Sequence, residues 1–398
     1  MYMLPSGEIE RKGVIMIYLD HAATTRVYPQ VMEEMEPYFY EKYANPSGAY
    51  DISVKNKEAV QRVREKLACV LGGKPEEIFF TSGGSESDNW AVKGVALANI
   101  DKGKHIITTK IEHHAVINSC KYLENFGYEI TYLDVDSQGR VRLEDVENSI
   151  RDDTILISIM AANNEIGTLQ PIEAIGWLAK KYGILFHTDA VQMFCQLPID
   201  VRKGEIDLLS ASAHKFGGPK GIGFLYVKEG TKLEPYIHGG SQEYKMRAGT
   251  ENVPYIVGMG KAVEICTKKM YATIAREQYL RDYLIRRVLE EIPGVKLNGP
   301  SRNRLPGNVN FCFEHLSGAS LLILLNENEI YASAGSACNA GSSEPSHVLK
   351  AIGVSKDYIE GAIRFTLGEE NTRQEIDKVV SLLKKYVREL RDNDNATG

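Results

Sequence analysis

Short apolar segments alternate with amphipathic segments through the first two thirds of the chain. Residues 78–80, 184–188 and 207–210 are apolar runs of strand length, whereas residues 172–182 carry apolar side chains at helical spacing. Apolar strands that alternate with helices are typical of a mostly parallel sheet covered by helices on both faces. The pattern therefore predicts a large α/β domain.

The pattern changes after residue 252, which indicates a second, smaller α+β domain. We place the large domain at residues 17–260 and the small C-terminal domain at residues 261–398, and the first residues of the chain are a candidate to pack with the small domain. The expected helices of this part are 253–270, 275–291, 319–326, 346–351 and 373–391, and its expected strands are 308–313, 330–332 and 362–367.

Length and composition exclude several classes of protein. The 398 residues have an ordinary globular composition and a net charge of −6 without a basic stripe, so nucleic acid is not an expected ligand. No apolar run reaches the length of a membrane span, and the first 16 residues do not resemble a secretory signal. Met16 is a candidate alternative start. The six cysteines lie far apart without a CxxC pair, which predicts free thiols in the cytoplasm and no zinc site.

The stretch 78–98 combines a strand, a small-residue turn and a helix that we expect from Ser87 onward. Free backbone N–H groups and the helix dipole converge in such a turn, so Gly84 and Ser85 are candidates to bind an anion. The alternative is an ordinary tight turn between strand and helix. The stretch matches neither GxGxxG nor GxxxxGK[ST], so a dinucleotide or nucleoside triphosphate finds no support.

Polar residues follow the expected strands at the edge where an α/β sheet binds ligands. Lys215 follows a strand among small residues, where a partly desolvated amine is suited to Schiff-base chemistry; a structural lysine is the alternative. Asp189 follows another strand, and a buried carboxylate there needs a cation. An anion cradle, a carboxylate and a lysine together fit a phosphorylated pyridine cofactor.

Five further residues complete the candidate site. His113 is placed to cover the ring of the cofactor, and Asn164 and Gln192 to hydrogen-bond its hydroxyl group. Cys338 lies in a run of small residues that cannot form a core, which is typical of a thiol that moves and reacts. We interpret the other five cysteines as buried and structural. Arg364 lies on an apolar strand and needs an anion, such as a substrate carboxylate.

These motifs resemble the cysteine desulfurases of the NifS/IscS class, which belong to the fold-type I pyridoxal-phosphate enzymes. The resemblance runs from Tyr18 to Gly368 in the order of the family. Its motifs are YLDHAATT, FTSGGSESDN, EHHAV, NNEIGTLQP, HTDAVQ, SAHKFGGPKG, RAGTENV, GSAC and IRFTLG. The chain departs from the family in His114, in the Gly84-Ser85 pair and in its N-terminal leader. None of these departures affects a catalytic role, so they bear on the choice of sulfur acceptor and not on the reaction.

The resemblance implies pyridoxal 5'-phosphate as the cofactor, with Lys215 attached to it and moving protons. It also implies a homodimer with shared sites, in which Thr250 reaches the phosphate of the partner subunit. The remaining roles are Asp189 on the pyridine nitrogen, His113 on the ring face, Asn164 and Gln192 on the ring oxygen, Gly84, Ser85, Ser212 and His214 on the phosphate, and Arg364 with Asn164 on the substrate carboxylate.

The implied reaction converts L-cysteine to L-alanine and leaves the sulfur as a persulfide on Cys338. The sulfur then passes to an iron–sulfur scaffold protein or a tRNA-thiolation protein, and Cys338 is a candidate transient cluster ligand; no resident metal is expected. The alternatives are a selenocysteine lyase, another fold-type I enzyme such as an aminotransferase, and a scaffold without enzymatic activity. An aminotransferase needs no mobile thiol, so Cys338 argues against it.

Overall fold

A computed structural model describes residues 16–334 and 345–397, with side chains up to residue 392. Its main feature is a seven-stranded sheet in which β8 runs antiparallel to both neighbours and all other neighbouring strands are parallel. The predicted α/β fold with a mostly parallel sheet is confirmed. The strands in spatial order are β2 (Ile78–Thr81), β8 (Gly223–Val227), β7 (Leu208–Ser212), β6 (Leu185–Asp189), β5 (Thr154–Ser158), β3 (His105–Thr109) and β4 (Glu129–Leu133).

Helices cover both faces of this sheet. Successive strand residues point to opposite faces, and the residues of the central strands are buried on both. Phe79 packs with α4 (Gly84–Ala98) and α5 (His114–Glu124), whereas Phe80 packs with helices of the other face. The helices that share the core with Phe80 are α1 (Pro29–Met35), α2 (Pro37–Tyr40), α3 (Asp51–Leu71), α6 (Leu143–Asn148), α7 (Ile172–Tyr182) and the first half of α8 (Val253–Glu291).

A second core forms around two small sheets. The antiparallel strands β9 (Val295–Leu297), β10 (Asn308–Phe313) and β12 (Ala362–Thr366) make one sheet, and β1 (Ile17–Tyr18) pairs with β11 (Ile330–Tyr331) in the other. The helices of this part are α9 (Gly318–Asn326), α10 (His347–Ala351), α11 (Lys356–Ile359), α12 (Arg373–Thr397) and the second half of α8, and the short 3-10 turns of the chain are η1 (Pro75–Glu77), η2 (Ala213–Lys215) and η3 (Glu243–Lys245).

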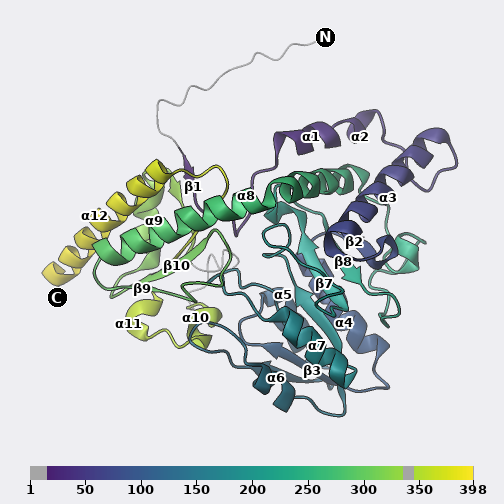
Figure 1. Ribbon diagram of the computed structural model, residues 1–398, viewed down its shortest axis with the longest axis horizontal. Coiled ribbons are helices and arrows are strands. Elements are labelled where there is room, and N and C mark those ends of the chain that lie inside the picture. Colours follow the sequence, from purple (N-terminus) through teal and green to yellow (C-terminus); the bar gives the residue numbers. More distant parts are fainter. Residues whose placement is uncertain (1–15, 335–344, 398) are drawn as a thin grey trace, which may run out of the picture.

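Helix α8 runs without a break from one core to the other (Figure 1). The expected division into helices 253–270 and 275–291 is wrong. Residues 271–274 contain neither glycine nor proline. Both ends of α8 are held by buried side chains such as Met259 and Leu284, and such packing outweighs the small helix penalty of Thr273 and Ile274.

Strand β1 pairs with β11, which comes more than three hundred residues later in the sequence. Ile17 and Leu19 are buried in the second core with Phe311 and Phe365, and Asp20 bridges to Thr366. The N-terminal segment thus packs with the C-terminal part of the chain, and the domain boundary at residue 260 stays a prediction.

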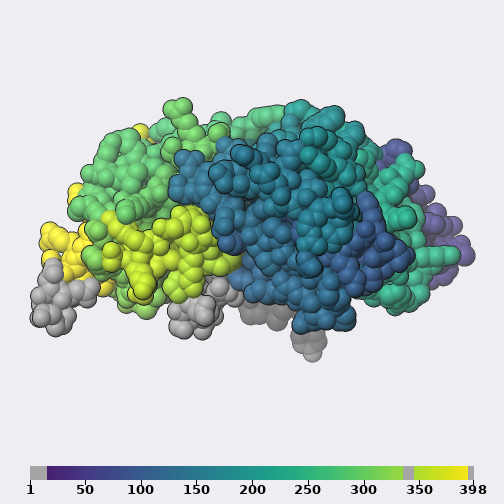
Figure 2. All heavy atoms as spheres, turned by 90° about the horizontal axis from the view of Figure 1, so that it is seen from below, coloured from purple at the N-terminus to yellow at the C-terminus, as the bar shows by residue number. Residues whose placement is uncertain are grey.

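The two parts also meet at a third apolar cluster. Val348 and Ile359, from α10 and α11, pack with Ile111 and Met160, which follow strands of the large sheet. In Figure 2 the lime surface of α10 and α11 lies directly against the blue surface of the large sheet's segments. Within the described ranges, no helix has the length and apolar character needed to cross a membrane.

Candidate active site

Lys215 lies in η2, directly after β7. Strand β7 extends to Ser212, two residues beyond the expected end, so Ser212 belongs to the strand and only Ala213 and His214 separate it from the lysine. The Nζ of Lys215 donates to the carbonyl oxygens of Ala22 (2.5 Å) and Ala23 (2.8 Å). The N-terminal segment therefore forms one wall of the site and orients the amine.

The predicted residues meet in one cavity of about 230 Å³, which we call the central cavity. It opens at the carboxyl ends of β5, β6 and β7, where an α/β sheet binds ligands. Its lining includes the sequence-predicted Gly84, Ser85, His113, Asn164, Asp189, Gln192, Ser212, His214, Lys215 and Arg364, together with Ala22, Ala23, Asp88, Met160 and Val191.

Asp189 ends β6 and is 6% exposed. Its Oδ1 accepts from the backbone N–H of Val191 at 2.9 Å. Burial raises the pKa of this carboxyl, while the positive charges of His113 and Lys215 act to lower it. A carboxylate that is held in this way favours a cationic partner in the cavity, such as a protonated ring nitrogen.

Backbone N–H groups converge at the start of α4. The helix begins at Gly84 and not at the expected Ser87, so Ser85 lies in its first turn. A Cβ on Gly84 would lie 2.6 Å from Cγ2 of Val191, so a side chain at this position would force Val191 to shift. A second hollow begins at this helix end and is lined by Ser82, Gly83, Gly84, Ser85, Ser212, His214 and Lys220, among others.

His214 lies at the edge of both hollows. Burial, followed by the nearby charges of Lys215 and Lys220, lowers its pKa to about 4. The imidazole is therefore neutral at pH 7. Its Nδ1 lies 3.2 Å from Oγ1 of Thr24, which leaves Nε2 for an anion.

His113 immediately precedes α5 and caps it, because its Nδ1 accepts from the backbone N–H of Ala115 at 3.2 Å. This contact fixes the ring at the wall of the central cavity. The next histidine, His114, turns instead toward His347, with ring centroids 4.7 Å apart. Only the first of the two adjacent histidines thus reaches the cavity, as expected.

Arg364 lies on β12 and is 1% exposed. Its guanidinium donates to the carbonyl oxygen of Asn164 (3.0 Å) and to Oδ1 of Asp20 (2.7 Å). Its Nε has no hydrogen-bond partner among the described residues. Asp20 and Asn164 thus orient the guanidinium of Arg364, which also lines the central cavity. A planar guanidinium can bind a carboxylate through two parallel hydrogen bonds.

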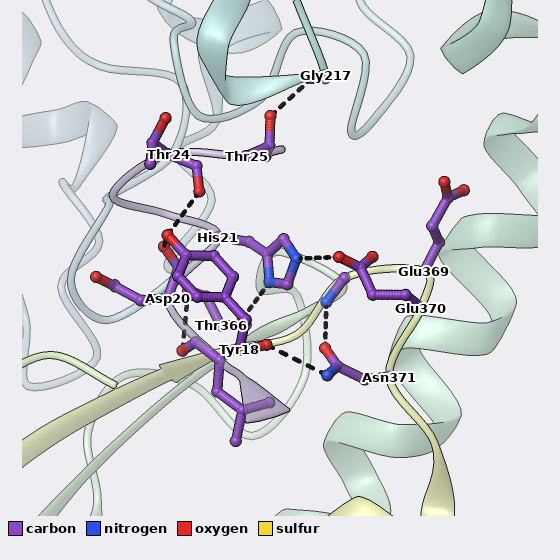
Figure 3. Close-up of polar contacts among 12 residues, drawn as sticks. Tyr18, Asp20, His21, Thr24, Thr25, Gly217, Thr366, Glu369, Glu370 and Asn371 are labelled. Carbon is purple, nitrogen blue, oxygen red and sulfur yellow. Dashed lines mark hydrogen bonds and ion pairs between the residues drawn. The ribbon is translucent and has the colours of Figure 1, made fainter. Parts of the chain in front are cut away.

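The segment that carries Ala22 and Ala23 is tied to both parts of the molecule (Figure 3). On one side, the ring of His21 bonds to the carbonyl oxygen of Thr366 through Nδ1 (2.8 Å) and to Oε1 of Glu370 through Nε2 (3.0 Å). On the other side, Oγ1 of Thr25 accepts from the N–H of Gly217 at 2.8 Å, two residues after Lys215. This segment therefore fixes the position of Lys215 relative to β12.

Three sequence predictions concern residues outside the cavity. Cys338 lies outside the described residues. Thr250 is exposed and does not line the central cavity. Four of the other five cysteines are buried, as expected, but Cys69 is exposed, because it lies on the solvent side of α3.

The sequence analysis missed the two alanine carbonyls that hold Lys215, and it missed Asp88. Backbone groups give no signal in a sequence. Asp88 lies on α4, one turn after Gly84 and on the same face of the helix.

Comparisons with known proteins identify relatives of this chain and solved structures similar to it. Residues 17–379 match the family described as aminotransferase class-V. The chain is 54% identical over 376 residues to cysteine desulfurase IscS of Methanosarcina thermophila, covering 94% of this chain and 93% of that one. Among solved structures, a NifS-like protein has a TM-score of 0.89 at 40% identity, covering 94% of this chain and all of the other. SspA in complex with cysteine has a TM-score of 0.79 at 40% identity, covering 89% and 100%.

Proposed function

Since this chain belongs to the class-V aminotransferase family, and within it to the cysteine desulfurases, we propose that it converts L-cysteine to L-alanine at the central cavity and passes the sulfur to Cys338. The observation that carries the proposal is the joint lining of one cavity by Asp189, Lys215 and Arg364. Asp189 ends β6, Lys215 follows β7 and Arg364 lies on β12. They offer an anion for the cofactor, an amine for its attachment and a cation for the substrate carboxylate.

The residues of the cavity fit pyridoxal 5'-phosphate. The phosphate would lie at the start of α4 with Gly84, Ser85, Ser212 and His214, where Gly84 packs closely against Val191. Asp189 would pair with the ring nitrogen, and Asn164 and Gln192 would hold the ring oxygen. His113 would cover the ring. When bound, this cofactor supplies an electron sink for changes at the carbon atoms of an amino acid.

The chain's own residues would bind the substrate and move its protons. Arg364 would hold the carboxylate of L-cysteine, oriented by Asp20 and Asn164. Lys215 would hold the cofactor, and its amine would also move protons at the substrate carbon. The carbonyl groups of Ala22 and Ala23 give the freed amine a defined place beside the substrate.

Sulfur transfer would use Cys338. Its thiolate attacks the substrate sulfur, an S–S bond forms as the C–S bond breaks, and the carbon part takes up protons and leaves as L-alanine. Support for this role comes from the GSAC motif and from the relatives named above. The SspA structure in complex with cysteine supports the choice of substrate.

The setting of the enzyme is also part of the proposal. We infer a homodimer in which Thr250 completes the phosphate site of the partner subunit, and an iron–sulfur scaffold or another protein as sulfur acceptor. The cytoplasmic location expected from the scattered cysteines stays a prediction. Selenocysteine lyase activity is the second candidate, because it can use the same residues.

The decisive test is mass spectrometry of the protein after treatment with L-cysteine. We expect one added sulfur atom on the peptide with Cys338, and alanine in equal amount. Cys338→Ala should keep the visible absorption of the bound cofactor and lose sulfide release in the presence of a thiol reductant. Cys69→Ala, which removes an exposed thiol, is the matched control and should keep full activity. Undiminished sulfide release by Cys338→Ala contradicts the mechanism.

The attachment of the cofactor has its own test. Borohydride reduction should link the cofactor covalently to Lys215, and Lys215→Ala should abolish the link. If the link persists in that variant, Lys220, which lines the neighbouring hollow, becomes the attachment site.

A further inference from the structure

Asp88 is a buried acid at the central cavity to which the reaction described above gives no task. It lies on α4 and is 1% exposed. One oxygen of Asp88, one oxygen of Asp189 and one ring nitrogen of His113 lie within 4.8 Å of one another. Two carboxyl groups at this distance in a buried place strongly disfavour a state in which both are ionised.

Among the described residues, no lysine or arginine forms an ion pair with Asp88, and the charge of the nearby His113 acts to lower the pKa of Asp189. His187 also lies beside Asp88, with its Nε2 3.7 Å from Oδ1 of Asp88. Burial lowers the pKa of His187 to about 3, so this ring is neutral. Oδ1 of Asp88 has no hydrogen-bond partner within the described ranges.

His187 is held by the two strands beside it. Its Nδ1 lies 2.8 Å from Oγ of Ser158 on β5, and its Nε2 lies 3.0 Å from Oγ of Ser210 on β7. Ser210 is also the register partner of Asp189, and its hydroxyl group acts to lower the pKa of Asp88. A buried hydrogen-bonded chain thus runs from Ser158 through His187 to Ser210, beside Asp88.

The other charged groups nearby also disfavour an anion at Asp88. Burial, followed by the charge of Asp189, raises the pKa of Asp88 well above its ordinary range, and Glu112 acts in the same direction. Glu112 itself is buried, and its pKa is raised to about 8. The charges of His113 and Lys215, by contrast, act to lower the pKa of Asp189 and so favour its ionised form.

We propose that Asp88 is a positioning residue that keeps its proton, so that Asp189 is the single carboxylate available to the ring nitrogen of the cofactor. A neutral Asp88 presents one O–H to the polar groups around it and adds no charge. The ring nitrogen then meets one carboxylate of fixed place and charge. The proposal rests on the proposed function for the identity of the ring, but the proton on Asp88 is a property of the protein alone.

The test is infrared spectroscopy of protein labelled with carbon-13 in its aspartate side chains, which separates aspartic acid from Glu112. At pH 7, with EDTA present, the wild-type apoprotein and holoenzyme should both show the C=O stretch of a protonated aspartic acid. The band should persist in Asp189→Asn and disappear in Asp88→Asn. Absence of the band in the wild type overturns the proposal, as does a band that is lost in Asp189→Asn.

Cofactor binding gives a second, independent measurement. Asn resembles a neutral acid, so Asp88→Asn should bind pyridoxal 5'-phosphate within about twofold of the wild type and keep the pH midpoint of its visible absorption. Asp88→Ala removes the hydrogen-bonding group and should bind about tenfold more weakly. A tenfold loss in Asp88→Asn would mean that the lost group is an anion, which overturns the proposal.

These outcomes are separable from those of the proposed function. If the wild type does not bind pyridoxal 5'-phosphate, the proposed function fails, while the apoprotein band still decides the state of Asp88. If Asp88→Asn does not fold, the spectra of the wild type and of Asp189→Asn decide the question without it.

Discussion

At the scale of single residues, Glu277 illustrates what burial does to a carboxyl group. It lies on α8, is 3% exposed and has no ion-pair partner in the described part of the chain. Burial, followed by the charges of Glu369 and Glu370, raises its pKa from 4.5 to about 8. The folded protein therefore holds a proton that the unfolded chain releases above about pH 4.5.

This difference predicts the pH dependence of stability. The wild type should lose ~1.4 kcal/mol of unfolding free energy per pH unit from this residue between about pH 5 and pH 8, because the unfolded chain binds fewer protons there. Glu277→Gln removes the titration. Its stability relative to the wild type should rise through this window and stay level above it, as measured by urea unfolding at several pH values.

Glu290→Gln is the control for this series, because Glu290 lies on the same helix but is exposed and pairs with Arg286. It should change stability by less than about 1 kcal/mol at every pH. A difference between Glu277→Gln and the wild type that does not vary from pH 5 to pH 8 would contradict the prediction.

Most of the candidate site could be predicted from the sequence at this scale. Asp189 ends one apolar strand and Lys215 lies three residues after the end of another, so their place at the sheet edge follows from the fold class. Asp88 could not be recognised, because its neighbours His187 and Ser210 come from strands that only the folded sheet brings together. The lysine's partners are backbone carbonyls, which any sequence provides.

At the scale of elements, the start of α4 decides how the site is built. The helix begins at Gly84, where the backbone passes close to Val191. Gly84→Ala should destabilise the protein by ~1–3 kcal/mol through overpacking and weaken the binding of pyridoxal 5'-phosphate. Both effects can be measured, by urea unfolding and by cofactor titration.

Val191→Ala is the matched partner for a double-mutant cycle, because it removes the methyl group that the new Cβ would meet. The double variant should recover at least ~0.5 kcal/mol relative to the sum of the single changes. Strict additivity would show that the packing against Val191 is not the cause of the Gly84→Ala defect.

Element types were predictable, whereas some boundaries were not. The strand-and-turn pattern around β2 indicated a helix, but Gly84 and Ser85 have lower helix propensity than alanine or leucine, so the sequence favoured a later start. In α8, the stretch 271–274 suggested a break that the packing of both ends overrides. In each case tertiary contacts outweigh a local preference of a few tenths of a kcal/mol per residue.

At the scale of the whole molecule, the proposed homodimer makes a prediction about which subunit supplies Thr250. In one heterodimer, Lys215→Ala and Thr250→Ala lie on different subunits; in the other, both changes lie on the same subunit. If Thr250 serves the partner's site, only the first heterodimer has a site with both residues intact. It should release sulfide faster at limiting cofactor.

The two heterodimers can be purified with different tags on the two subunits and compared directly. The reverse order of activities would assign Thr250 to its own subunit. Equal activity of the two heterodimers at limiting cofactor would show that Thr250 does not contribute to cofactor binding. The exposed position of Thr250, outside the central cavity of its own chain, favours the first result.

The pairing of β1 with β11 has a consequence for synthesis of the protein. Ile17 leaves the ribosome early, but its partner Ile330 follows more than three hundred residues later. Asp20 and the carbonyls of Ala22 and Ala23 cannot take their places until that late strand and β12 exist. Such long-range pairing slows folding. A nascent chain that already contains Lys215 thus lacks the wall that orients the amine, and this wall forms only after β12 has been synthesised.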